Sequence, residues 1–433
     1  MHVERSEADR GSGARRGGSP ELAIIGLGHV GLPLWLVFSA QTPCIGVDKN
    51  PNRIKEIEEA SSTLDEPLRA PLMARHQRAP EGDGHLLTTL DRPMRAILVA
   101  VECESEAALC GVIAEVLPWL EPGGVLMIAS TCQPAWFAGV VAFLTGEGRR
   151  VGENLYLAHV PERLMPGASA LDEVQHLPRV IGGHTSACAR AAVEHYARIS
   201  LATIEQVSLE EAALIKIAEN AYRAINIVLA NEIETVAHAY GMDAGRVMAI
   251  ANTHPRVALH RPGAGAWGRC LPLAMELLAG EGSALARASH TLNARRPGEL
   301  VERLLCELES AGVRIEEAAV VVAGLAYKKG QRDTREGAGT RMVKTLLERG
   351  VGAVRVCDPH VEFEMWRNEL ALDAMRVQVC SSLEEAIQGA HGVLVSVRHD
   401  AFDALLSDVE AMQARGDDAS HPQMCAPAAW VFV

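Results

Sequence analysis

A glycine-rich turn between an apolar strand and a helix limits the possible folds of this 433-residue chain more than any other segment. The segment ELAIIGLGHVG places Gly26, Gly28 and Gly31 in the spacing G-x-G-x-x-G. There the first glycine permits the turn, the second lets the backbone approach a pyrophosphate, and the third permits close helix packing. Asp48 follows about 20 residues later, where an acid binds a ribose 2′-hydroxyl and repels a 2′-phosphate. The pattern predicts a domain that binds NAD rather than NADP.

Short apolar strands alternate with helical segments in both halves of the chain. Continuous apolar strands separated by helices are typical of a parallel sheet covered on both faces. Between the halves, residues 208–240 have the pattern of one long helix, which Ser208 and Glu211 begin with a capping box and Gly241 ends. We therefore predict an α/β fold with two Rossmann-like doubly wound domains joined by a long-helix connector.

Composition excludes several classes of protein. A net charge of −14 argues against general nucleic-acid binding, which favours a basic face. The ten cysteines show neither zinc-ligand spacing nor a disulfide framework, so no metal is expected and the thiols fit a reducing cytoplasm. No apolar run reaches the roughly 20 residues that cross a bilayer, so no membrane insertion is expected. Residues 1–20 are rich in Gly, Ser and charge, which predicts a flexible tail rather than a signal peptide.

One cysteine and two helical polar residues are candidates for chemistry. Cys270 follows a loop with Gly263, Gly265 and Gly268, and it adjoins Arg269, whose charge would favour the thiolate. A free cysteine is more often a small buried hydrophobe, and that alternative stays open at this point. Lys216 and Asn220 lie one helical turn apart among apolar neighbours, where they would form either a solvated polar stripe or a partly buried pair.

These motifs together resemble the UDP-glucose/GDP-mannose dehydrogenase family, in particular its UDP-N-acetylmannosamine type. The resemblance covers roughly residues 20 to 405. Its members oxidise a sugar alcohol to a carboxylate in two NAD-linked steps. It implies that Lys216 and Asn220 stabilise the alkoxide at the sugar carbon, and that Cys270 carries the thiohemiacetal and thioester. The segments AHVPERLMPGASALDE and STCQP resemble family motifs that make Glu162 the residue handling the hydrolytic water and place Thr131 by the nicotinamide.

The same resemblance assigns binding residues and domains. Beyond the glycines and Asp48, the cofactor would contact Val30, Arg53, Glu66, Thr131 and Lys328. The nucleotide sugar would contact Arg256, His260, Gly263, Gly265 and Arg335. The expected domains are an NAD-binding Rossmann domain (21–205), a central helical dimerisation and catalytic-loop region (206–300), and a nucleotide-sugar-binding Rossmann-like domain (301–433). A homodimer built on the long helix is expected, because that helix is too apolar to be solvated all round.

The chain departs from the family pattern near the chemistry. Ala274 stands where the family has an aspartate, and Trp267 and Arg269 replace the usual glycine and histidine. VAVECESEA replaces a Pro-Thr-Pro segment, and Gly337-Ala338 replaces a Ser-Pro pair. Because one lost acid/base group typically costs on the order of 10²- to 10⁴-fold in rate, the substrate or the reaction is expected to differ.

Three functions remain open from the sequence. The first is an NAD-dependent dehydrogenase that oxidises a UDP- or GDP-activated sugar to a uronate for polysaccharide or antibiotic sugars. The second keeps hydride transfer without net oxidation to the acid, as in an epimerase, a dehydratase or a single-step alcohol oxidase of an unusual activated sugar in specialised metabolism. The third is a non-catalytic relative that binds the nucleotide sugar.

Overall fold

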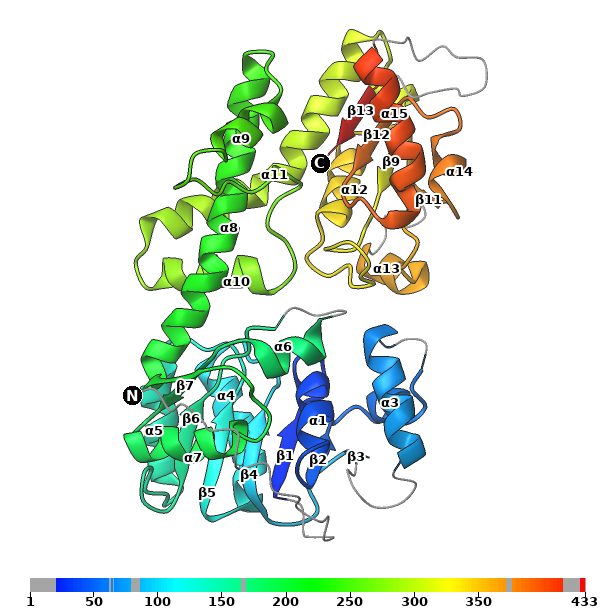
Figure 1. Cartoon of the computed structure of the whole chain (residues 1–433). Coiled ribbons are helices and arrows are strands. Elements are labelled where there is room, and N and C mark those ends of the chain that lie inside the picture. Colours follow the sequence, from blue (N-terminus) through cyan, green and yellow to red (C-terminus); the bar gives the residue numbers. More distant parts are fainter. Residues whose placement is uncertain are drawn as a thin grey trace. The chain divides into compact units, whose positions relative to one another are not determined.

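The computed structural model describes residues 21–61, 64, 66–78, 86–164, 169–370, 376–415 and 429–432. The predicted tail, residues 1–20, lies outside the described residues. The chain divides into two compact units, Met1–Lys216 and Ile217–Val433. Each unit contains one sheet covered by helices on both faces, which confirms the predicted α/β fold (Figure 1). Within the described ranges, no helix is long and apolar enough to cross a membrane.

The first unit is built on a sheet with the strand order β3-β2-β1-β4-β5-β6-β7-β8. Neighbouring strands run parallel except for β6 and β7, which are antiparallel. The strand order reverses between β1 and β4, which is where α/β proteins of this type bind ligands at the carboxyl edge. The strands are β1 Leu22–Ile25, β2 Cys44–Val47, β3 Leu86–Leu87, β4 Met94–Val99, β5 Leu120–Ile128, β6 Tyr156–His159, β7 Arg179–Gly183 and β8 Ile204–Ser208.

Side chains accept the first free backbone N–H groups of three helices in the first unit. Asn50, Ser105 and Thr185 cap these helices in this way. The helices are α1 Gly31–Ser39, α2 Pro51–Glu58, α3 Glu66–Arg78, α4 Glu106–Val116, α5 Trp136–Gly146, α6 Ala170–His176 and α7 Ser186–Tyr196, with a short 3₁₀ turn η2 at Leu117–Trp119.

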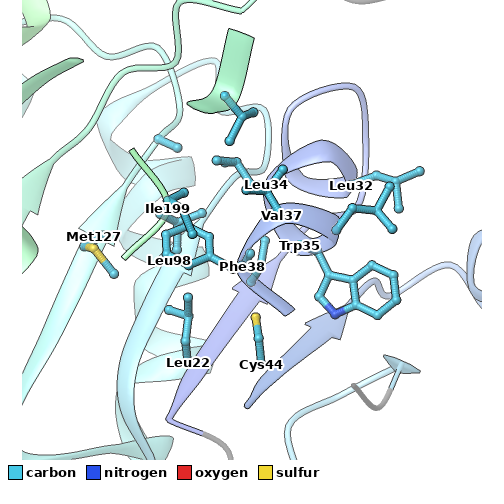
Figure 2. Packing of buried hydrophobic residues seen from close by; sticks show 14 of the residues in the cluster. Leu22, Leu32, Leu34, Trp35, Val37, Phe38, Cys44, Leu98, Met127 and Ile199 are labelled. Carbon is cyan, nitrogen blue, oxygen red and sulfur yellow. The ribbon is translucent and has the colours of Figure 1, made fainter. Parts of the chain in front are cut away.

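Alternating side chains of each strand supply two cores, one on each face of the sheet. In β1, Leu22 and Ile24 pack with Trp35 and Phe38 of α1, whereas Ala23 belongs to the core on the opposite face (Figure 2). Because both faces are buried, the strand is apolar at every position rather than at alternate ones. This explains why the continuous apolar runs in the sequence predicted a doubly covered sheet.

A single long helix, α8 (Leu209–Ala239), follows the first sheet. Its start is a capping box: Ser208 N donates to Glu211 Oε2 at 2.8 Å, and Glu211 N donates to Ser208 Oγ at 3.1 Å. It ends before Gly241, whose φ of +64° suits a residue without a Cβ atom. Both ends of the predicted 208–240 helix are thus confirmed to within a residue.

The second unit contains the helices α9 Ala244–Ala251, α10 Cys270–Gly280 and α11 Ala284–Ser310, followed by a parallel sheet with the order β11-β10-β9-β12-β13. Its strands are β9 Ala319–Ala323, β10 Ala353–Cys357, β11 Val377–Val379, β12 Gly392–Val395 and β13 Ala429–Phe432. Its further helices are α12 Ala338–Glu348, α13 Phe363–Leu370, α14 Leu383–Ile387 and α15 Asp403–Arg415, with 3₁₀ turns η3 Ile315–Glu317 and η5 Asp400–Phe402. The order around β9 repeats the order around β1, so both sheets are Rossmann-like.

Candidate active site

The three glycines of the first unit have three different surroundings. Gly26 has a φ of +89°, and a Cβ atom there would lie 2.9 Å from the carbonyl oxygen of Ala100. A Cβ atom at Gly31 would overlap the carbonyl oxygen of Gly26. Gly28 has nothing within 4 Å of the same point, so its backbone faces open space. Gly26 and Gly31 therefore shape the turn, and Gly28 leaves the room that a diphosphate needs.

The start of helix α1 adjoins this open space. Val30 caps the helix without a side-chain hydrogen bond, and no acidic residue lies in the first turn. Free backbone N–H groups at a helix N-terminus favour a phosphate group. The residues present thus fit the pyrophosphate of a dinucleotide.

Asp48 and Arg53 both support the glycine loop through Leu27. Leu27 N donates to Asp48 Oδ2 at 2.9 Å, and Arg53 Nε donates to the Leu27 carbonyl oxygen at 2.9 Å. Asp48 lies half-buried just after β2, and its Oδ1 accepts from Asn50 N at 2.9 Å. The structure therefore brings Asp48 and Arg53 to the glycine loop, at the position expected for a ribose-binding acid.

Two other predicted cofactor residues have less detailed surroundings. Thr131 lies half-buried after the carboxyl end of β5, beside Ser130, whose hydroxyl donates to the Val101 carbonyl. Glu66 is the first residue of α3, and its side chain lies outside the described part of the chain.

Glu162 lies in a buried ion pair that the sequence did not predict. Arg179 Nη1 donates to Glu162 Oε1 at 2.6 Å, and Tyr196 Oη donates to the same oxygen at 3.3 Å. The Arg179 guanidinium also lies over the Tyr196 ring, 4.7 Å from its centre. Burial raises the pKa of Tyr196 well above its ordinary value, so the phenol remains a donor. Both described hydrogen bonds of the Glu162 carboxylate end on Oε1.

Lys216 and Asn220 lie on one face of α8. Asn220 is buried and Lys216 is half-buried. Ala224, Ile227 and Asn231 continue this face at helical spacing. Ala224 and Ile227 pack against Ala266, Leu271 and Met275 around the cysteine loop. Asn220 therefore lies one turn before the point where α8 meets this loop.

Polar side chains that the sequence analysis did not single out fix the loop before Cys270. Gly263 N donates to Asn231 Oδ1 at 2.7 Å, and Arg296 Nε donates to the Gly263 carbonyl at 3.0 Å. Asn293 binds both backbone groups of Ala266, accepting from its N–H at 2.6 Å and donating to its carbonyl at 2.9 Å. Glu234 pairs with Arg296. These residues had no sequence signal, because buried Asn and Arg in a helix look like an ordinary polar face.

Cys270 is exposed and is the first residue of α10. Burial raises the pKa values of Cys132 and Cys357 far above the ordinary range of a thiol. Among the other described cysteines, Cys306 on α11 is also exposed and Cys110 is half-buried. Exposure alone therefore does not single out Cys270, but exposure at a helix start does.

The departures from the family pattern lie around this loop. Ala274 lies one turn after Cys270 in α10 and is buried. Trp267 is half-buried, its Nε1 donates to the Ala264 carbonyl at 2.6 Å, and the Arg341 guanidinium lies 4.5 Å from its ring centre. Trp267 thus links the loop to α12 of the same unit.

The remaining predicted substrate residues are more exposed. Arg256 is exposed and His260 is half-buried in the segment that precedes the cysteine loop. Lys328 and Arg335 are exposed after β9, and Asp333 accepts from Arg335 Nε at 2.9 Å and from Nη2 at 2.7 Å. Among the described residues, no group of three or more His, Cys, Asp or Glu side chains could hold a metal ion.

The Rossmann-like sheet and the glycine loop define the first unit as the NAD-binding part of an oxidoreductase. Three family models match the chain. They describe the UDP-glucose/GDP-mannose dehydrogenase family NAD binding domain over residues 20–200, its central domain over 210–296 and its UDP binding domain over 321–421. The chain belongs to this family.

Individual relatives agree with the family assignment. The UDP-N-acetyl-D-mannosamine dehydrogenase of Pyrococcus horikoshii is 31% identical over 401 residues, which cover 89% of this chain and 90% of the relative. The NDP-N-acetyl-D-galactosaminuronic acid dehydrogenase of Ralstonia solanacearum is 29% identical over 414 residues, 91% and 94% of the two chains. The solved structure of the Pyrococcus horikoshii UDP-D-ManNAc dehydrogenase matches with a TM-score of 0.80 and 28% identity, covering 89% of this chain and 90% of that one. The protein is an NAD-dependent oxidoreductase that acts on a nucleotide sugar.

Proposed function

We propose that this protein oxidises a UDP-activated N-acetylhexosamine to its uronate through a thioester on Cys270. The single observation that carries the proposal is an exposed cysteine at the start of α10, on a loop packed against the helix face that carries Asn220. The names of the relatives support an N-acetylated sugar, as does the NTHPRV segment with Arg256. His260, Gly263, Gly265 and Arg335 complete the proposed substrate site. Gly28, Val30, Asp48, Arg53, Glu66 and Thr131 complete the proposed cofactor site, and Lys328, within the UDP binding domain, is proposed to contact the cofactor or the nucleotide sugar.

The chemistry divides among the residues of this chain. NAD, when bound, accepts a hydride in each of the two oxidations. In the first, the Lys216 ammonium and the Asn220 amide stabilise the negative charge on the sugar oxygen. The Cys270 thiolate then adds to the aldehyde carbon, which gives a thiohemiacetal. Loss of a second hydride leaves a thioester, and water cleaves it to release the carboxylate and the thiol. Glu162 is proposed to orient that water through Oε2, while Arg179 and Tyr196 hold Oε1.

Substitution of the cysteine tests this function. Cys270→Ser should stop the reaction after one oxidation, whereas Cys306→Ser, which changes the other exposed thiol among the described residues, should leave product formation unchanged. Ala274→Asp should raise turnover, because it restores a carboxylate one turn from Cys270. Undiminished uronate formation by Cys270→Ser would overturn the proposal. Retained hydride transfer without any acid product in the wild type would favour the epimerase or single-step oxidase alternative.

The exposed side of α8 supports a homodimer. Tyr222, Leu229 and Val236 recur at seven-residue spacing and are 58%, 47% and 59% exposed, and Ile250 of α9 is 59% exposed. A second copy of this chain is the proposed occupant, because such a long apolar stripe is costly to leave in water. A mass of 46.4 kDa by light scattering at micromolar concentration would contradict this.

The three family models support the division into domains at 21–205, 206–300 and 301–433. The nine described cysteines carry thiols rather than disulfides, which supports the proposal of a reducing, cytoplasmic location.

A further inference from the structure

A buried histidine and aspartate hold both ends of the segment Leu325–Gly330, the first part of the loop that follows β9. His399 is fully buried, Asp358 is 6% exposed, and His399 Nε2 lies 3.1 Å from Asp358 Oδ2. At the start of the loop, Leu325 N and Ala326 N donate to Asp358 Oδ2 at 2.7 and 3.1 Å. At its far end, Gly330 N donates to His399 Nδ1 at 3.3 Å.

The two hydrogen bonds of His399 fit one tautomer of the imidazole. Because Nδ1 accepts from the Gly330 N–H, it carries no proton, and the proton of the neutral ring must lie on Nε2, where it donates to Asp358. Burial alone would raise the pKa of Asp358, but hydrogen bonds from His399 and from the backbone N–H groups of His360 and Leu325 lower it overall. The carboxylate is therefore charged, and the His399 ring connects it to the backbone N–H of Gly330.

The rest of the surroundings keeps the ring in place. The His360 ring centre lies 4.9 Å from that of His399, and Phe402 packs edge-on at 5.6 Å. Gly324 fits against Val397, because a Cβ atom there would lie 2.6 Å from the Val397 carbonyl oxygen. The segment that carries His399 is thus packed against the start of the loop, and the ring reaches its end.

Lys328 lies between the two fixed ends, with its side chain exposed. We propose that His399 is a positioning residue for nucleotide-sugar binding, which sets the place of Lys328 by tying Gly330 to the buried Asp358. This inference rests on the proposed function of the second unit. It predicts that loss of the Gly330 bond weakens nucleotide binding and leaves the rate of the chemical steps nearly unchanged.

Two substitutions separate the two hydrogen bonds of the His399 ring. In His399→Gln, the amide nitrogen can replace Nε2 as the donor to Asp358, but Gly330 loses its acceptor. In His399→Asn, the amide oxygen can replace Nδ1 as the acceptor for Gly330, but the bond to Asp358 is lost. His391→Gln is the matched control, since His391 Nδ1 accepts from Ala319 N at 2.9 Å at the opposite end of β9.

The experiment is a titration of UDP into each full-length variant, with hydrogen exchange followed over residues 325–331. We expect His399→Gln to weaken UDP binding by about three- to tenfold, the effect of one lost neutral hydrogen bond, with faster exchange at Gly330. His399→Asn and His391→Gln should bind UDP like the wild type. In turnover of UDP-N-acetylmannosamine, His399→Gln should raise KM with little change in kcat.

The outcomes distinguish this inference from the function on which it rests. Equal UDP affinities in His399→Gln and His399→Asn, or unchanged exchange at Gly330 in His399→Gln, would overturn the positioning role. A wild-type protein that does not bind UDP would overturn the assignment of the second unit as the nucleotide site, and with it the ligand part of the inference. If both His399 variants lose the fold, exchange at Gly330 in the wild type decides: rapid exchange there contradicts the hydrogen bond to His399.

Discussion

Asp48 and Asp358 occupy equivalent positions in the two Rossmann-like units, but their carboxylates have different partners. Each follows the second strand of its sheet and accepts a backbone N–H from the loop after the first strand, from Leu27 in one unit and Leu325 in the other. Asp48 is half-buried and accepts two described hydrogen bonds, both from backbone N–H groups. Asp358 is buried and accepts four, one of them from His399.

The glycines beside these two acids also occupy equivalent positions in the two units. Gly26 and Gly324 have φ values of +89° and +86°. A Cβ atom at Gly31 would overlap the carbonyl of Gly26, just as one at Gly339 would overlap that of Gly324. The two loops thus share a backbone design, and they differ in what the acid is available to bind. Asp48 retains an exposed side that suits a ribose hydroxyl, whereas the carboxylate of Asp358 already accepts hydrogen bonds from groups of the protein.

The largest expected effect is the loss of stability on removal of Asp358. Asp358→Ala would leave four donors without their acceptor in a buried site, which should cost at least about 3 kcal/mol. Asp48→Ala should cost about 1 kcal/mol, because water can reach the freed N–H groups. Denaturant unfolding, with hydrogen exchange to assign each transition to its unit, measures both. Equal losses of unfolding free energy in the two variants would show that Asp48 and Asp358 stabilise their units to the same extent.

Acid should remove the stability that depends on His159 before it removes the stability that depends on Asp358. His159 is fully buried with a backbone carbonyl as its described hydrogen-bond partner, and burial lowers its pKa from 6.5 to about 4. Because the unfolded chain binds the proton first as the pH falls, stability is lost between about pH 6.5 and 4, by up to roughly 3 kcal/mol.

The pH range in which the stabilising contribution of Asp358 is lost lies lower. The lowered pKa of Asp358 means that its contribution is lost only as the pH falls through that value, below the ordinary 3.8 of an aspartate. His159→Gln should flatten the stability profile between pH 6.5 and 4, as measured by unfolding at a series of pH values. An identical slope in this variant and the wild type would contradict the assignment.

The smallest effect concerns cofactor choice. Asp48→Ala removes the charge that repels a 2′-phosphate, so the preference for NAD over NADP should fall on the order of tenfold, or ~1.4 kcal/mol. Competitive titration of the two cofactors measures this, with Glu58→Gln as a control that removes an exposed charge nearby. An unchanged preference would leave the glycine loop as the sole support for the cofactor site.

Local sequence patterns predicted the strands, the glycine loop and the long helix. The candidate site also depends on contacts between residues that are far apart in the sequence. The glycine spacing, the apolar strands and the Ser208–Glu211 capping box depend on residues close in sequence, so they could be found without the structure. Arg179 holds Glu162, Asn293 holds Ala266, and His399 holds Gly330, each across a long stretch of chain. No periodicity marks such pairs, because their residues become neighbours only when the strands and helices pack.

The exposure of Cys306 could not be predicted from the sequence either. Its sequence context is that of an ordinary helix, so the sequence alone gave no reason to distinguish it from the buried cysteines. Cys270 could be chosen as a candidate from the sequence because three glycines precede it, whereas the exposure of a side chain depends on which helix faces are covered.

Counting the NADH formed for each molecule of UDP-N-acetylmannosamine consumed tests the proposed oxidation most directly. The account predicts two NADH and one uronate per substrate, because Cys270 carries the aldehyde into the second oxidation. A ratio of one with an aldehyde or ketone product, or conversion with no net NADH, would contradict it.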